Sequence, residues 1–204
     1  LEPLATRKCS ERFLEIVSKL PSLIGGSADL AGSNNTKTKN HKIIKPNDFS
    51  GNYIHYGVRE HAMCGIMNGI SLHSGLIPYG GTFLIFSDYC KPSIRLAAMM
   101  KQKVIYVFTH DSIGLGEDGP THSGNYDIAY LRCIPNMMIC TPSDENETRH
   151  LLTTAYLHKG PSSVRYPRGI GSNVKVDNSL EPLEIGKAKL ITDQNSKAVI
   201  LNFG

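Results

Sequence analysis

Several features that mark whole classes of protein are missing from this sequence. No apolar run approaches the length of a membrane-spanning helix, and the first residues carry no signal-peptide pattern. The five cysteines are odd in number and form no CxxC pair, which argues for reduced thiols and against a disulfide framework. We therefore expect a cytoplasmic protein that makes no contact with a membrane.

Charge of one sign is not concentrated anywhere. The 22 Lys and Arg residues and the 18 Asp and Glu residues are spread along the chain, without a basic run or a basic stripe interleaved with aromatic residues. This distribution argues against nucleic acid as a partner. A small anionic ligand needs only two or three cations, so this class of ligand stays open.

Two common ligand-binding motifs are also absent. No glycine-rich turn is followed by Gly-Lys-Ser/Thr, as a Walker phosphate loop requires, and no histidine pair has the HExxH spacing of a zinc site. His110, Glu117, Asp118 and His122 carry ligand atoms for a metal, but their spacing matches no established motif. We therefore predict no metal site within this chain.

What the sequence does contain is an alternation of helical and strand patterns. Its 204 residues, 40% of them hydrophobic, can bury one full core. The expected helices are 7–20, 60–74, 83–100, 128–134 and 142–158, and the expected strands are 23–29, 52–57, 77–83, 104–108, 137–140 and 162–166. This order predicts an α/β domain with a doubly wound, mainly parallel sheet and helices on both faces.

Three local features accompany this prediction. Thr6 is placed to cap the first helix, and the polar segment 31–51 is typical of a long surface loop. Helix 60–74 carries small and apolar residues on nearly all sides, so we expect it to be buried, with its glycines closely packed against a neighbour. The expected organisation is a domain at 1–170, a polar linker at 171–196 and the first strand of a further domain at 197–204.

The segment from His110 to His122 is rich in groups that transfer protons. It follows the apolar run 104–108, so it lies at the carboxyl end of a central strand, where open α/β sheets place ligand sites. Residues 114–119 match GxGxxG, but their acidic side chains would face a pyrophosphate and Pro120 interrupts the helix that a dinucleotide site needs. A polar loop that only connects two elements is the alternative to a ligand site of another kind.

Four further residues have a structural explanation beside a functional one. Glu60 stands in the first turn of its helix, where free N–H groups and the helix dipole stabilise a carboxylate. Phe83, Phe86 and Tyr89 recur every third residue at the start of the next helix. Such a stripe packs in a core more often than it binds a cofactor.

Longer motifs resemble a known family. Residues 7–8, 25–30, 53–63, 78–83 and 109–122 carry the likeness. They resemble the central, pyrimidine-binding domain of transketolase, over about residues 5–122. After Gly124 the likeness changes, since the motifs at 130–137, 141–147, 164–169 and 201–204 look like the sister enzyme 1-deoxy-D-xylulose-5-phosphate synthase. The chain therefore reads as a mosaic of the two.

The resemblance implies thiamine diphosphate as the cofactor. In such enzymes a glutamate at the place of Glu60 hydrogen-bonds the pyrimidine N1′ and so promotes ionisation of the thiazolium C2–H. Aromatic residues at the places of Phe83, Phe86 and Tyr89 stack against the pyrimidine ring. Nothing here resembles the Gly-Asp-Gly…Asn motif of the family, so Mg²⁺, or Ca²⁺, and the diphosphate would be held by a separate domain.

The resemblance also implies sugar phosphates as substrates. His110 and His122 would hydrogen-bond substrate hydroxyls and shuttle protons, and Asp118 would recognise the C2 hydroxyl of the donor. An arginine can bind a phosphate bidentately through its planar fork. The residues that match the phosphate-binding positions are Arg7, Ser33 and Arg168.

The two sister activities differ in the second substrate. Transketolase moves a two-carbon ketol unit from a ketose phosphate to an aldose phosphate, whereas the synthase decarboxylates pyruvate and condenses the fragment with glyceraldehyde 3-phosphate. The sequence Gly57-Val-Arg-Glu-His-Ala62 has the transketolase form, where the synthase typically carries Glu-Gln-His. Tyr130 and Arg132, on the synthase-like side, could change acceptor specificity. We expect transketolase activity, with the synthase as the alternative.

The resemblance further implies that this chain holds half of a site. In this family the site forms between the pyrimidine domain of one subunit and the diphosphate domain of another, so we expect a homodimer that is inactive without a diphosphate domain. Two other interpretations stay open, namely a non-catalytic binding or dimerisation module and a subunit of a split enzyme.

Overall fold

A parallel sheet forms the centre of the protein. In a computed structural model, residues 4–111, 114–124, 126–177, 179–192 and 197–203 are described. The six strands follow the order β2-β1-β3-β4-β6-β5, and every neighbouring pair is parallel. Their bounds are β1 (Leu23–Ser27), β2 (Tyr53–His55), β3 (Ile77–Phe83), β4 (Ile105–Thr109), β5 (Met138–Cys140) and β6 (Ser162–Arg165). The predicted parallel sheet is confirmed, and β4 lies in its interior.

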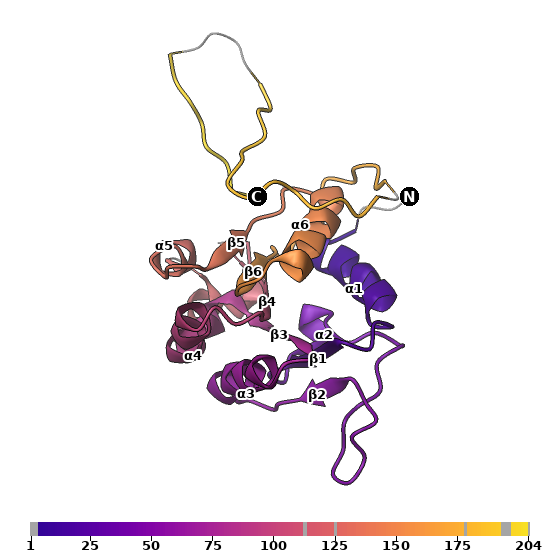
Figure 1. Cartoon of the computed structure of the whole chain (residues 1–204). Coiled ribbons are helices and arrows are strands. Elements are labelled where there is room, and N and C mark those ends of the chain that lie inside the picture. The colour runs from indigo at the N-terminus through magenta and orange to yellow at the C-terminus, as the bar shows by residue number, and fades with distance from the viewer. Residues whose placement is uncertain (1–3, 112–113, 125, 178, 193–196, 204) are drawn as a thin grey trace.

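Helices cover both faces of the sheet (Figure 1). Ile105 and Val107 of β4 pack in one core cluster with α1 and α6, while Tyr106 and Phe108 pack in a second cluster with α3 and α4. Successive side chains of a strand point to opposite faces, so β4 is buried on both sides, as its apolar run predicts. The helices are α1 (Thr6–Val17), α2 (Ala31–Asn34), α3 (Glu60–His73), α4 (Ser87–Met99), α5 (Asp127–Leu131) and α6 (Glu145–Leu157).

The start of α1 differs from the sequence prediction, whereas α6 begins within the range expected for it. The N-cap of α1 is Ala5, which makes no side-chain capping bond, and Thr6 already lies inside the helix and is buried. The prediction that Thr6 caps α1 was therefore wrong, because a capping side chain must precede the first helical residue. In α6, Asp144 caps the helix by accepting a hydrogen bond from the Glu147 N–H at 2.7 Å.

The segment 31–51 is only partly a surface loop. The short helix α2 opens it, and a buried polar cluster follows. The Nδ1 atom of His41 accepts from the Thr38 N–H at 2.9 Å, and its Nε2 lies 2.8 Å from the Tyr79 hydroxyl, which donates to the Thr36 carbonyl. The prediction of a surface loop was wrong for residues 31–41, because the polar groups of this part bond to one another and to β3.

Helix α3 is buried on one side only. Met63 and Met67 pack in the core, whereas Ile66 and Leu72 are 47% and 55% exposed. A Cβ atom added at Gly69 would meet no atom within 4 Å. The prediction of burial on nearly all sides was wrong. The prediction of a close neighbour was wrong for Gly69, whereas a Cβ atom at Gly65 would lie 3.8 Å from Ser93 Oγ of α4. Apolar residues in a sequence do not show whether a neighbour covers them.

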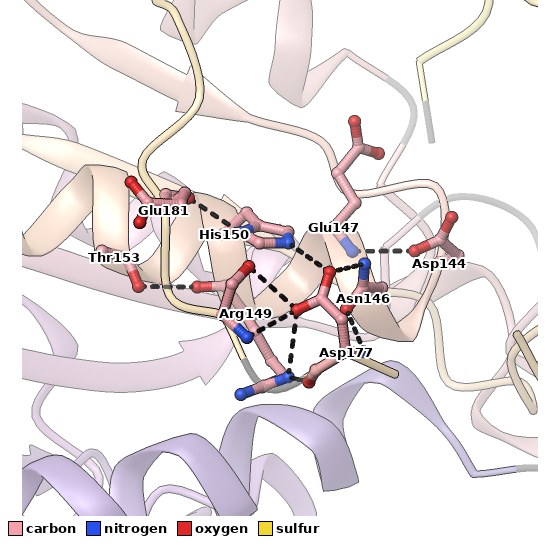
Figure 2. A network of polar contacts seen from close by, with 9 residues as sticks. Asp144, Asn146, Glu147, Arg149, His150, Thr153, Asp177 and Glu181 are labelled. Carbon is pink, nitrogen blue, oxygen red and sulfur yellow. Dashed lines mark hydrogen bonds and ion pairs between the residues drawn. The ribbon is translucent and has the colours of Figure 1, made fainter. Parts of the chain in front are cut away.

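The start of the predicted linker lies along α6. Asp177 contacts three side chains of this helix, as Figure 2 shows: Asn146, Arg149 and His150. Further on, the Leu183 N–H donates to Thr154 Oγ1 at 2.8 Å. Polar residues that are typical of a free linker therefore bind the exposed side of a helix.

The last described segment, 197–203, forms no strand, and Val199 and Ile200 are 85% and 92% exposed. A strand is stabilised by pairing with a neighbouring strand, and the sheet of the described residues does not include this segment. The first strand of a further domain stays a prediction. Among the described helices, none combines the length and apolarity needed to cross a membrane.

Candidate functional site

A cavity of about 330 Å³ opens at the carboxyl ends of the central strands. It collects residues from α1, from α2, from the ends of β3 and β4, and from the segments that follow β4 and β6. Parallel strands bring their carboxyl ends to the same edge of a sheet, which explains why distant segments meet here. The lining residues are Arg7, Lys8, Gly32, Ser33, Asn35, Phe83, His110, Asp118 and Arg168.

His110 occupies the wall of this cavity directly after β4. Its backbone has a positive φ of 59°, a conformation that turns the chain sharply out of the strand. The imidazole ring stacks on Phe83 with 3.8 Å between ring centroids. Burial, and next the charge of Arg7, lowers the pKa of His110 to about 4. The side chain is therefore neutral near pH 7 and can accept a proton or a hydrogen bond.

Two arginines from opposite ends of the domain meet at the cavity. Arg7 of α1 donates through Nη1 to the carbonyl of Arg168 at 2.8 Å. Burial, and next the charge of Arg168, lowers the pKa of Arg7, but an arginine stays protonated in proteins. The two guanidinium groups therefore make this part of the cavity electropositive, as binding of a phosphate requires.

Acidic groups of the segment after β4 compensate this charge. Arg168 forms an ion pair with Glu117, and Asp118 lies 3.8 Å from the Arg168 guanidinium. The hydrogen bond from Arg168 lowers the pKa of Glu117 to about 2. Glu117 is exposed, so it can separate from Arg168 at small cost when a ligand anion takes its place.

The predicted aromatic row lies beside the cavity and forms a series of ring contacts. Phe83 and Phe86 stack at 5.6 Å between centroids, and Tyr89 follows at 6.0 Å from Phe86. His122 meets the Phe86 ring edge-on at 5.3 Å. Tyr89 is 62% exposed, so core packing does not account for the whole row.

Glu60 is buried at the first position of α3. Its side chain is only 8% exposed, and within the described ranges no hydrogen-bond donor or ion-pair partner contacts its carboxylate. A capping carboxylate would accept hydrogen bonds from backbone N–H groups, so the capping explanation from the sequence does not account for Glu60.

Most of the predicted site residues meet at the cavity. The three phosphate-binding candidates line it together with His110, Asp118 and Phe83. His122 and Phe86 contact the ring of Phe83 from beside it. The predicted residues outside the lining are Glu60, Phe86, Tyr89 and His122.

Sequence reasoning missed three lining residues. Lys8, Gly32 and Asn35 also face the cavity. Each is adjacent in sequence to a predicted phosphate-binding residue or separated from one by a single residue. For Gly32 and Asn35 the available signal is the polar composition of segment 31–51, which by itself indicates only exposure.

No metal ligand set is formed by the described residues, since no group of three His, Cys, Asp or Glu side chains converges. The histidines and carboxylates of the segment 110–122 point to different partners. His110 contacts Phe83, and Glu117 contacts Arg168.

Comparison with known proteins assigns this arrangement to a family. The family described as transketolase, pyrimidine binding domain, matches residues 2–172. This chain belongs to that family. It is 48% identical to transketolase of Cereibacter sphaeroides over 200 residues, and 52% identical to transketolase of Sinorhizobium medicae over 162 residues.

Solved transketolase structures have the same fold. Transketolase from Leishmania mexicana superposes with a TM-score of 0.80 at 44% identity over 83% of this chain, and the enzyme of Campylobacter jejuni does so with 0.80 at 38% over 85%. A split gene transketolase, whose description is "inactive beta4 tetramer", superposes with a TM-score of 0.70 at 25% identity over 90% of this chain. The predicted family and fold class are confirmed.

The matches cover most of this chain but only part of each relative. The chain spans 30% of the Cereibacter protein, 23% of the Sinorhizobium protein and 26% of the Leishmania structure. The Cereibacter match reaches 97% of this chain, so similarity to transketolase continues beyond Gly124. The sequence after Gly124 therefore remains similar to transketolase, although its motifs were expected to resemble the sister enzyme.

Proposed function

We propose that this chain supplies the pyrimidine half of a thiamine-diphosphate-dependent transketolase site. In this function a two-carbon ketol unit moves from a ketose phosphate to an aldose phosphate. The observation that carries the proposal is the cavity itself, which joins two arginines, a neutral histidine and a carboxylate from distant segments. These are the groups that a phosphorylated polyhydroxyl compound needs as partners.

Each group has a defined task in this proposal. Arg7, Arg168 and Ser33 bind the phosphate, with Arg168 exchanging Glu117 for the ligand. His110 accepts a proton or a hydrogen bond from a substrate hydroxyl because it is neutral. Asp118 accepts a hydrogen bond from a donor hydroxyl close to the same cavity wall.

Glu60 and the aromatic row fit the pyrimidine part of the cofactor. Thiamine diphosphate supplies a carbanion at C2 of its thiazolium ring when it is bound. The buried Glu60 carboxylate has an acceptor oxygen available for a protonated ring nitrogen, and the rings of Phe86 and Tyr89 offer a stacking surface. Mg²⁺ would be held by the diphosphate domain.

A partner that carries the diphosphate domain fits the exposed side of α3 and α4. Ile66 and Leu72 of α3 and Leu96 and Met99 of α4 are exposed, at 42% to 65%. Gly69 leaves open space on the same helix, which allows a neighbouring helix to approach closely. An apolar surface of this kind is typical of a permanent interface, here with another subunit of a homodimer or with a separate chain.

The cofactor role of Glu60 is tested by reconstitution. The chain is combined with a diphosphate-binding domain, Mg²⁺ and thiamine diphosphate, and exchange of the cofactor C2–H into deuterated water is followed by NMR. We expect Glu60→Gln to slow this exchange by roughly 10²-fold or more, because the amide cannot take part in proton transfer at N1′.

Glu60→Asp is the matched control, since it keeps a carboxylate and should retain part of the exchange rate. Wild-type exchange in a folded Glu60→Gln protein would contradict the cofactor role of Glu60.

A further inference from the structure

A chain of three buried polar groups reaches from α2 to the cavity histidine. Thr109 Oγ1 donates to Oδ1 of Asn34 at 2.6 Å, and the same Oγ1 lies 2.8 Å from Nδ1 of His110. Asn34 and Thr109 are both completely buried. They are 75 positions apart in the sequence, so the contact is a product of the fold.

The number of hydrogens that these three side chains can donate determines which group donates and which accepts in each hydrogen bond. A hydroxyl group has one hydrogen to donate and can accept on its oxygen. Because Thr109 uses its hydrogen toward Asn34, its oxygen can only accept from His110. The proton of a neutral His110 ring must then be on Nδ1.

We propose that Asn34 and Thr109 are positioning residues that set the tautomer of His110, with the proton on Nδ1 and a free lone pair on Nε2. No described residue hydrogen-bonds to Nε2, and His110 lines the cavity. Nε2 is therefore the acceptor that His110 presents to a ligand hydroxyl. In a hydroxyl-to-imidazole transfer, the proton moves to Nε2 and the Nδ1–H bond to Thr109 is kept.

The surroundings keep His110 in the neutral form, in which the choice of tautomer matters. The side chain is 5% exposed, its ring stacks on Phe83, and the charged or titratable groups that act on it are Arg7, Arg168, Asp118 and His122. The catalytic role of this tautomer rests on the proposed function, whereas the tautomer itself follows from the contacts of Asn34 and Thr109.

The test is ¹⁵N NMR of the histidine side chains in the full chain at pH 7, with the His110 signals assigned from their loss in His110→Gln. We expect Nδ1 of His110 to be protonated and Nε2 to have the shift of an unprotonated ring nitrogen. An Nε2–H tautomer in the wild type would overturn the proposal, because Asn34 would then have to present its amide nitrogen to Thr109.

Two variants of Asn34 form a matched pair. Asn34→Leu removes the acceptor, so the Thr109 hydroxyl becomes free to donate to Nδ1, and we expect the Nε2–H tautomer to become the major form. Asn34→Asp keeps an acceptor oxygen and should keep the Nδ1–H tautomer. An unchanged tautomer in a folded Asn34→Leu protein would overturn the proposal.

Thr109→Ser and Thr109→Val give a second comparison. The serine keeps the hydroxyl and should leave the His110 spectrum unchanged, whereas valine should abolish the preference for Nδ1–H. If the tautomers are as expected but the reconstituted wild-type enzyme has no transketolase activity, only the proposed function is contradicted. Failure of the tautomer proposal and failure of the proposed function are therefore distinguishable.

Discussion

Gly25 of β1 leaves space for the ring of Tyr79, its register partner in β3. A Cβ atom at this position would lie 2.2 Å from the ring of Tyr79, which is fully buried and bonded to His41. We predict that Gly25→Ala lowers the free energy of unfolding by roughly 1–3 kcal/mol, because the ring has no space to move away. Urea denaturation measures the change.

Gly69 of α3 is the matched control for this substitution. A Cβ atom added there would have no neighbouring atom within 4 Å, and alanine favours a helix over glycine by about 1 kcal/mol. Gly69→Ala should therefore leave the stability unchanged or raise it. Equal effects of the two substitutions would contradict our account of Gly25.

The lowered pKa of His41 makes the free energy of unfolding depend on pH. Burial, and next the charge of Lys37, lowers its pKa to about 4 from an ordinary value of 6.5. The unfolded chain therefore binds a proton more readily than the folded protein, so stability is complete above about pH 6.5 and falls as the pH approaches 4. His110, whose pKa is also about 4, acts in the same direction.

The expected loss between these pH values is about 3 kcal/mol for His41, from 1.36 kcal/mol per pKa unit. In His41→Gln this part of the pH dependence should disappear, although the variant is less stable at pH 7 because it lacks the bonds to Thr38 and Tyr79. Urea denaturation of both proteins at pH 7 and pH 4.5 gives the comparison. An equally steep decline in His41→Gln would show that other groups are responsible.

At the scale of secondary structure, a buried ion pair holds the start of the segment that follows β4. Arg165 Nη2 of β6 lies 3.3 Å from Asp111 Oδ2, and both side chains are less than a tenth exposed. Asp111 also donates its N–H to the Tyr166 carbonyl. These contacts fix the residue after His110 and so fix the direction in which the segment enters the cavity.

We predict that Asp111→Ala lowers the free energy of unfolding by roughly 3–5 kcal/mol, because it leaves the arginine charge buried without its carboxylate. The double variant Asp111→Ala, Arg165→Met should recover part of this loss, since no unpaired charge remains. Denaturant unfolding of the two proteins separates the effects. A double variant no more stable than Asp111→Ala would argue against this explanation.

The elements themselves were largely predictable from the sequence. Local patterns are enough to place a buried strand such as β4 and a helix such as α6 to within a few residues. The carboxyl end of a parallel strand then predicts the place of His110, whereas Arg7 and Arg168 were predicted from the family resemblance. What local patterns lack is information on neighbours.

That lack explains the errors. The apolar residues of α3 gave no indication that one side of the helix has no cover within the described chain, and the polar residues around His41 gave no indication that they satisfy one another. The contact between Asn34 and Thr109 joins residues 75 positions apart. No spacing rule finds such a pair.

At the scale of the whole molecule, the linker is held against α6 over its first part. Asp177 binds Asn146, Arg149 and His150, all drawn in Figure 2. Asp177→Ala should speed amide hydrogen exchange in residues 173–183 while global stability stays within about 1 kcal/mol, because the contacts are exposed. Ser179→Ala is a milder control that removes one bond to the same carboxylate. Unchanged exchange in both variants would contradict this role of Asp177.

The central claim is that this domain contributes the pyrimidine half of a transketolase site, together with residues that bind the sugar phosphate. The most direct measurement combines the chain with a diphosphate-binding domain, thiamine diphosphate and Mg²⁺, and follows ketol transfer from xylulose 5-phosphate to ribose 5-phosphate beside carbon dioxide release from pyruvate. We expect ketol transfer to dominate and Asp118→Ala to reduce it strongly. Pyruvate offers no hydroxyl to His110 or Asp118, and each group left unpaired costs roughly 1–3 kcal/mol. Robust release of carbon dioxide from pyruvate without ketol transfer would contradict the claim.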